Sequence, residues 1–170
     1  MTAGTFKQVY FSLHPKLYRI AFTILKNVED AEDVLQDMYF KLWDSRGKLS
    51  SVNNPEAYCI TLVKNLCFDI LRSPKIIKNE EIIEEYELID QSPDAETDMV
   101  YKEMIALIKS ILNHLPAKQR RVFDLRVFAD CSSDEIEKIT GESPENVRVL
   151  LSRARNTLKT KFKYYKNDGR

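Results

Sequence analysis

Hydrophobic residues recur along this chain with the period of an α-helix. The clearest pattern lies between Glu29 and Asp44, where the apolar residues are Ala31, Val34, Leu35, Met38, Tyr39 and Leu42. They are spaced so that all of them fall on one face of a helix. The pattern therefore predicts an amphipathic helix with a fully specified inner face.

One further helix is predicted before this one, and another is predicted after it. From Phe6 to Lys26 the apolar spacing is again helical, with an interruption or kink expected near Pro15. Pro55 is expected to open a helix that runs to about Arg72, because proline is favoured in the first turn. The intervening stretch, 45–54, has the composition of a loop.

The second half of the chain predicts four more helices. Apolar residues from Val100 to Leu115 mark one that Pro116 ends, and residues 117–128 form another with a cationic start. Ser132 and Glu135 have the spacing of a capping box, so a short helix is expected to begin at residue 133.

Gly141 can end that short helix in the left-handed conformation, and the pair 143–144, Ser-Pro, is a start signal for the next. A short helix, a tight turn with glycine and a longer second helix form the layout of a helix-turn-helix.

The long last helix has two different faces. Its apolar stripe consists of Val147, Leu150, Leu151, Ala154, Leu158 and Phe162, and it is expected to face a core. Its cationic stripe consists of Arg148, Ser152, Arg155, Lys159 and Lys163, with Arg153, Lys161 and Lys166 adding charge. Such a stripe suits entry into a DNA groove and contact with phosphates, although a solvated face that complements the helix dipole is the simpler alternative.

The two halves are separated by an acidic stretch. Residues 74–95 hold two cationic and seven anionic side chains, lack helical periodicity and are bracketed by prolines. We interpret this stretch as a linker. The predicted fold class is all-α, with two small helical domains, 1–73 and 96–170, joined by the linker; the C-terminal domain has four helices and contains the helix-turn-helix.

Composition narrows the classes of function. Hydrophobic residues make up 44% of the 170-residue chain and charged residues 31%, as in a folded protein with an ordinary surface. The net charge is zero, but residues 148–170 hold eight cationic side chains and one anionic one, which is the distribution that a nucleic-acid surface requires. The three cysteines lack metal-binding or disulfide spacing, and no segment resembles a membrane span or signal peptide. We therefore expect a cytoplasmic protein with no cofactor, no metal site and no membrane insertion of its own.

The outer face of the Glu29–Asp44 helix is acidic. It carries Asp30, Asp33 and Asp37 at helical spacing, with Glu29, Glu32 and Gln36 beside them. Carboxylates in a first turn stabilise the helix start, which accounts for Asp30 but poorly for Asp37. A metal site for hydrolysis would need inward projection and usually histidine. A protein-docking surface is the better interpretation.

The helix from Pro55 to Arg72 combines aromatic and cationic side chains on one polar face. The face comprises Tyr58, Thr61, Lys64, Asn65, Phe68 and Arg72. Rings that stack on unpaired bases and cations that follow the backbone bind single-stranded nucleic acid. The alternative, that Tyr58 and Phe68 are core residues at the edge of a wide apolar face, is equally compatible with the spacing.

Two sets of motifs together resemble a known family. The segment 115–126, Leu-Pro-Ala-Lys-Gln-Arg-Arg-Val-Phe-Asp-Leu-Arg, and the later 151–158, Leu-Ser-Arg-Ala-Arg-Asn-Thr-Leu, resemble region 4 of bacterial sigma factors. The segment 30–43, Asp-Ala-Glu-Asp-Val-Leu-Gln-Asp-Met-Tyr-Phe-Lys-Leu-Trp, is similar to the polymerase-binding helix of region 2. Two motif sets in this order with a short linker resemble the extracytoplasmic-function (ECF) group of the sigma-70 family.

This resemblance implies a partner for each surface. The polymerase-binding residues, against the β′ clamp helices, would be Asp30, Asp33, Gln36 and Asp37. The residues that meet the melted −10 strand would be Arg46, Lys48, Asn53, Lys64 and Asn65, to which the polar face of the helix adds Tyr58, Thr61, Phe68 and Arg72. The residues that meet the −35 duplex would be Pro144, Glu145, Asn146, Arg148, Ser152, Arg153 and Arg155, to which the cap and the cationic stripe add Ser143 and Lys159. The resemblance also implies contact with the β flap of the polymerase and an anti-sigma factor.

The sequence departs from the family pattern at several of these surfaces. Family members often carry Trp and Arg where this chain has Tyr58 and Thr61, and Val149 and Leu150 replace the Ser and Arg common in the recognition helix.

We therefore interpret the chain as a non-enzymatic sigma factor that gives core RNA polymerase its promoter choice. A stand-alone helix-turn-helix regulator of duplex DNA is the first alternative, but it leaves the acidic face and the aromatic-basic helix unexplained. A metal-dependent nuclease using Asp30, Asp33 and Asp37 is the second, and the outward spacing of these residues counts against it.

Overall fold

The chain folds into helices that form two units. The computed structural model describes residues 2–73 and 98–168, and every regular element within these two ranges is a helix. Contacts divide the chain into the units Met1–Glu87 and Leu88–Arg170. The all-α fold class is thus confirmed. The predicted linker, 74–95, lies outside the described residues, and the predicted domain bounds 1–73 and 96–170 stay predictions.

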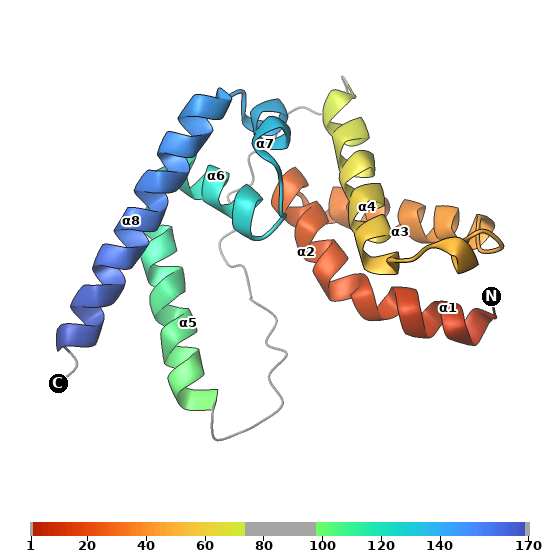
Figure 1. The fold of residues 1–170 in the computed structure, drawn as a ribbon, viewed down its shortest axis with the longest axis horizontal. Helices are drawn as coiled ribbons and strands as arrows, with labels where there is room; N and C mark the ends of the chain where they lie inside the picture. The colour runs from red at the N-terminus through yellow and green to blue at the C-terminus, as the bar shows by residue number, and fades with distance from the viewer. Residues whose placement is uncertain (1, 74–97, 169–170) are drawn as a thin grey trace. The chain divides into compact units, whose positions relative to one another are not determined.

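The first unit is built from four α-helices. They are α1 (Ala3–Tyr10), α2 (His14–Leu25), α3 (Val28–Asp44) and α4 (Pro55–Arg72), with 3₁₀ turns at Phe11–Leu13 and Leu49–Ser51 (Figure 1). The predicted kink is the first of these turns, which separates α1 from α2. Pro15 lies in the first turn of α2, just beyond this 3₁₀ turn, where its missing N–H breaks no helical hydrogen bond.

Helices α2, α3 and α4 form the core of this unit. Figure 1 shows α4 crossing α3, and α2 packs against both. The predicted inner face of α3 is buried, with Ala31, Val34, Leu35, Met38 and Leu42 almost inaccessible and Tyr39 partly buried. Asparagine side chains cap the starts of α3 and α4. The Asn27 side chain accepts from the Asp30 N–H at 2.9 Å at the start of α3, and the Asn54 side chain accepts from the Ala57 N–H at 3.0 Å at the start of α4.

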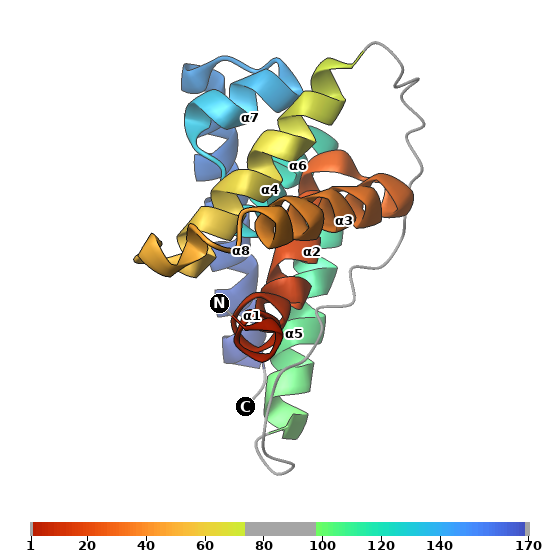
Figure 2. The same cartoon turned by 90° about the vertical axis from the view of Figure 1, so that its right-hand side faces the viewer.

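The second unit contains the predicted four helices. They are α5 (Asp98–Asn113), α6 (Ala117–Val127), α7 (Ser133–Thr140) and α8 (Pro144–Asp168). Both views show the long α8 extending well beyond α7 (Figures 1 and 2), and α5, α6 and α7 all pack against it. Its core includes Leu112, Leu115, Phe123 and Ala154, with Ile108, Phe128 and Leu158 against them.

A partly buried ion pair joins the helices of this unit. The carboxylate of Asp124 is 3% exposed and accepts from the Arg120 Nε at 2.8 and 2.9 Å. A second nitrogen of Arg120 donates to the Asn113 side-chain oxygen at 3.0 Å, which ties α6 to the end of α5.

The helix-turn-helix forms as the local sequence predicts. The Ser132 Oγ accepts from the Glu135 N–H at 3.2 Å, while the Glu135 carboxylate accepts from the Ser132 N–H at 2.8 Å. Gly141 has φ of 74°, the left-handed conformation that costs glycine least. The Ser143 Oγ accepts from the Asn146 N–H at 3.2 Å and so caps the start of α8.

One predicted core position of α8 is wrong. Val147, Leu150, Leu151 and Ala154 are buried, but Phe162 is 37% exposed. The buried cluster of this unit reaches Leu158, which packs on its edge. We attribute the exposure of Phe162 to its place beyond that cluster, where the helical period continues but fewer neighbours cover it.

Candidate functional site

The acidic residues of α3 lie opposite its buried face. Asp33, Gln36 and Asp37 are exposed, whereas Asp30 is partly buried in the first turn. The exposed oxygens of Asp33 and Asp37 lie on a rigid helix about one turn apart, because four residues rise about 6 Å. This face can attract a cationic partner surface without rearrangement.

The same surface of α3 continues into exposed aromatic residues that the sequence analysis missed. Phe40 is 74% exposed, and Trp43 is also exposed. The Arg46 guanidinium lies 4.7 Å from the centre of the Trp43 ring and donates to the Trp43 carbonyl at 2.8 Å. The exposure of Phe40 could have been predicted from the helical period, because a residue two positions from both Met38 and Leu42 must point away from their face.

A groove of about 490 Å³ borders the acidic face. Its lining consists of Phe11, His14, Glu32, Leu35, Gln36 and Tyr39. The Tyr39 ring stacks on Phe11 with centres 4.5 Å apart, and its hydroxyl lies 3.1 Å from the His14 Nδ1. Burial, together with the nearby Cys59, raises the pKa of Tyr39 to about 12, so its hydroxyl keeps its proton at neutral pH.

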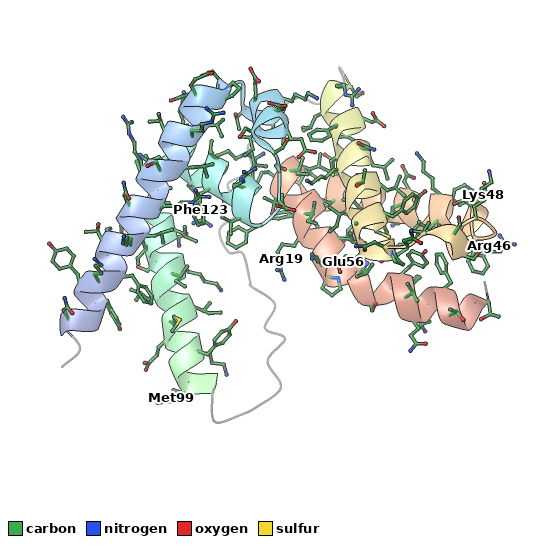
Figure 3. The ribbon with its side chains drawn as sticks, in the orientation of Figure 1. Arg19, Arg46, Lys48, Glu56, Met99 and Phe123 are labelled. Atoms are coloured by element: carbon green, nitrogen blue, oxygen red, sulfur yellow. The ribbon has the colours of Figure 1, made fainter. Side chains whose placement is uncertain are left out.

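The residues predicted to meet the −10 strand lie on α4 and on the connection that precedes it. Arg46, Lys48 and Asn53 are exposed on this connection, and Figure 3 shows Arg46 and Lys48 at the same end of the unit.

On α4 the predicted face is mostly open to solvent. Tyr58 is 42% exposed, Thr61, Asn65 and Arg72 are exposed, and Lys64 and Phe68 are partly buried. The Thr61 hydroxyl donates to the Ala57 carbonyl at 3.0 Å, and Arg72 pairs with Asp69 at 3.5 Å. The helical spacing did not decide whether Tyr58 and Phe68 are core or surface residues. Tyr58 is exposed and therefore available for stacking, whereas Phe68 is partly buried.

The residues predicted to meet the −35 duplex lie along α8 and at its start. Arg148, Ser152, Arg153, Arg155 and Lys159 are exposed on α8. Ser143 and Glu145 are exposed at its start, and Pro144 and Asn146 are partly buried there. The predicted cationic stripe therefore faces solvent on the second helix of the helix-turn-helix.

A hollow of about 350 Å³ lies between this stripe and its neighbours. Arg126, Arg148 and Arg155 contribute guanidinium groups to its wall, and Ser133, Leu151, Ser152 and Asn156 complete it. A cluster of guanidinium groups suits a phosphate. Arg126 was not predicted, because it lies on α6 and only the fold brings it to α8; its guanidinium donates to the Cys131 carbonyl at 2.8 Å.

Within residues 2–73 and 98–168, no three His, Cys, Asp or Glu side chains converge in a way that could hold a metal ion. None of the helices in these ranges is both long and apolar enough to cross a membrane.

Comparison with known proteins matches both units to one family. The model of Sigma-70 region 2 matches residues 9–75, and that of Sigma-70, region 4 matches residues 105–158. The RNA polymerase sigma factor SigV of Bacillus subtilis is 30% identical over 142 residues, which span 81% of this chain and 78% of SigV. The chain belongs to the sigma-70 family of sigma factors.

Within this family the sigma factor falls in the ECF group. The ECF RNA polymerase sigma factor SigX of Bacillus subtilis is 22% identical over 91% of this chain and 82% of SigX. The ferric citrate uptake sigma factor FecI of Escherichia coli is 26% identical over 88% of this chain and 86% of FecI. The protein is thus a sigma factor of transcription initiation, and members of this family are non-enzymatic regulators of transcription.

Solved structures of sigma factors are similar to a lower degree. The sigma factor RpoE of Bartonella quintana, solved with the anti-sigma factor NepR, is 24% identical with a TM-score of 0.45 and covers 94% of this chain and 97% of that one.

Proposed function

We propose that this sigma factor divides promoter recognition between its two units. The exposed face of α3, with Asp30, Asp33, Gln36 and Asp37, docks on the β′ clamp helices of core RNA polymerase. The cationic stripe of α8 then meets the −35 duplex. The connection before α4 and the exposed face of α4 hold the melted −10 strand.

The single observation that carries this proposal is the placement of three chemically different surfaces on separate, rigid helices. The acidic face of α3 lies opposite the buried face of that helix. An aromatic-polar face lies on α4, and a cationic face lies on α8, the second helix of the helix-turn-helix. Cations that contact phosphates give affinity, and base contacts near the start of a recognition helix give specificity. Exposed rings such as Tyr58 supply the stacking that unpaired bases require.

Further partners follow from membership of the ECF group. We expect the second unit to contact the β flap of the polymerase, and we expect an anti-sigma factor to hold the protein inactive. The same role would place the protein in the cytoplasm, where bacterial polymerase works.

A mobility-shift comparison separates this proposal from a stand-alone regulator. A promoter-length duplex is incubated with the protein alone, with core polymerase alone, and with both. We expect a promoter-specific complex only when both proteins are present. Tight, sequence-specific binding by the protein alone, unchanged by core polymerase, would show a stand-alone helix-turn-helix regulator instead.

A further inference from the structure

Glu142 occupies the turn between α7 and α8 and contacts groups on α6, α7 and α8. Its carboxylate lies 2.6 Å from the Lys118 Nζ at the start of α6 and accepts from the Asn146 Nδ2 at 2.5 Å. Its own N–H donates to the Thr140 Oγ1 at 3.2 Å. The side chain is only 16% exposed, so these contacts hold it in one place within the turn.

The Glu142 carboxylate is ionised at neutral pH in this setting. The hydrogen bond from Lys118, and then that from Asn146, hold the pKa of Glu142 below its usual range. An ionised carboxylate can only accept hydrogen bonds. The group of Asn146 that faces it must therefore be the amide nitrogen, and the Asn146 Oδ1 must point to the other side.

Asn146 lies where a recognition helix reads bases. It is in the first turn of α8, its N–H is bonded to the cap Ser143, and it is partly buried. In helix-turn-helix proteins the N-terminal residues of the second helix contact base edges in the major groove. A free asparagine can turn its amide to exchange its donors and its acceptor, but a carboxylate bonded to one amide hydrogen fixes the amide orientation and leaves the oxygen and the second amide hydrogen for the DNA.

We infer that Glu142 is a positioning residue that orients Asn146 to read an amino-bearing base of the −35 element, an adenine or a cytosine. This inference rests on the proposed role of α8 at the −35 duplex. Adenine and cytosine present amino donors in the major groove, whereas guanine and thymine present carbonyl oxygens at the corresponding edge and would face the Asn146 oxygen unfavourably. Lys118 offsets the charge of Glu142, which would otherwise repel the DNA phosphates.

The test uses the holoenzyme made from the full chain and core polymerase. Run-off transcription is measured from promoters that carry each of the four bases at every −35 position. The wild-type protein should favour adenine or cytosine at one position by about tenfold or more. Asn146→Ala should abolish that preference. Glu142→Gln should reduce it at the same position, because a glutamine amide can donate as well as accept and so frees Asn146 to turn.

The double variant and two controls complete the test. Glu142→Gln combined with Asn146→Ala should have the same base profile as Asn146→Ala alone. Glu137→Gln, an equal loss of charge at an exposed position of α7, should keep the wild-type profile. Lys118→Met, which removes one of the contacts that hold Glu142, should lower transcription at all promoters and should weaken the preference no more than Glu142→Gln does. If Glu142→Gln is unfolded by circular dichroism, Glu142→Asp, which keeps the charge but shortens the reach to Asn146, replaces it.

Several results would overturn the inference. They are an unchanged profile in the Glu142 variant, an even loss at every position, or a change at a different position from Asn146→Ala. These results leave the proposed function standing as long as the wild-type holoenzyme depends on the −35 sequence. A wild-type holoenzyme that transcribes without any −35 preference would contradict the proposed function itself.

Discussion

Removing the acidic charge of α3 should weaken binding to core polymerase without affecting the fold. The change is Asp33→Asn together with Asp37→Asn, which keeps the size of both side chains. Both residues are exposed and point away from the buried stripe that holds α3 in the unit. The free energy of unfolding should therefore stay within about 0.5 kcal/mol of the wild type.

The size of the binding effect follows from this exposure. An exposed ion pair contributes up to about 1 kcal/mol, because water screens it. Two such pairs should contribute at most about 2 kcal/mol, which corresponds to a Kd for core polymerase that is higher by up to roughly 30-fold. Because charges at a rim mainly steer association, we expect the loss to fall on the association rate and to shrink as salt is added.

The assay is competition for core polymerase between the variant and a fluorescently labelled wild-type protein, at low and high salt. The control is Glu103→Gln with Glu137→Gln, which removes two exposed charges from the second unit instead. An unchanged Kd in the α3 variant, or an equal loss in the control, would refute the assignment of this face as the docking surface.

Four further predictions concern the fold and the other surfaces. Ser132→Ala removes the cap of α7 and should cost about 1 kcal/mol in denaturant unfolding of the protein; no change would mean that the cap is not formed in solution. Asp124→Asn leaves Arg120 without its charged partner and should cost about 2 to 4 kcal/mol in the same measurement, whereas a loss below about 0.5 kcal/mol would contradict a buried pair. Tyr58→Ala should weaken opening of the −10 region by about 1 to 3 kcal/mol, measured by permanganate reactivity, and Tyr58→Phe should keep it if stacking is the contribution; equal losses would point to the hydroxyl. Burial raises the pKa of the Cys59 thiol to about 11, so at neutral pH it should be alkylated only after unfolding, and rapid labelling of the native protein would contradict this.

The helix ends were predictable from sequence because local chemistry determines them. The capping box of Ser132 and Glu135 needs only residues three apart, and Pro55 after Asn54 combines a fixed φ with a side-chain cap. The inner face of α3 was predictable for a similar reason, since the period of the helix orders its side chains whatever they pack against.

Contacts between distant residues were not predictable in this way. Lys118 reaches Glu142 only because α6 packs against α7, and Arg126 joins Arg148 only because α6 also packs against α8. The exposure of Phe162 has the same origin, because periodicity shows which face a residue shares but not where the neighbouring helices stop covering it.

Run-off transcription from core polymerase, with and without this protein, is the most direct test of the central claim. The templates should include the promoter upstream of the protein's own operon and a version of it with altered −35 and −10 elements. We predict a discrete transcript only when the protein is present, lost when either element is altered. If the protein adds no initiation at any promoter tested, although it is folded and core polymerase is active with another sigma factor, the proposed role in promoter recognition is wrong.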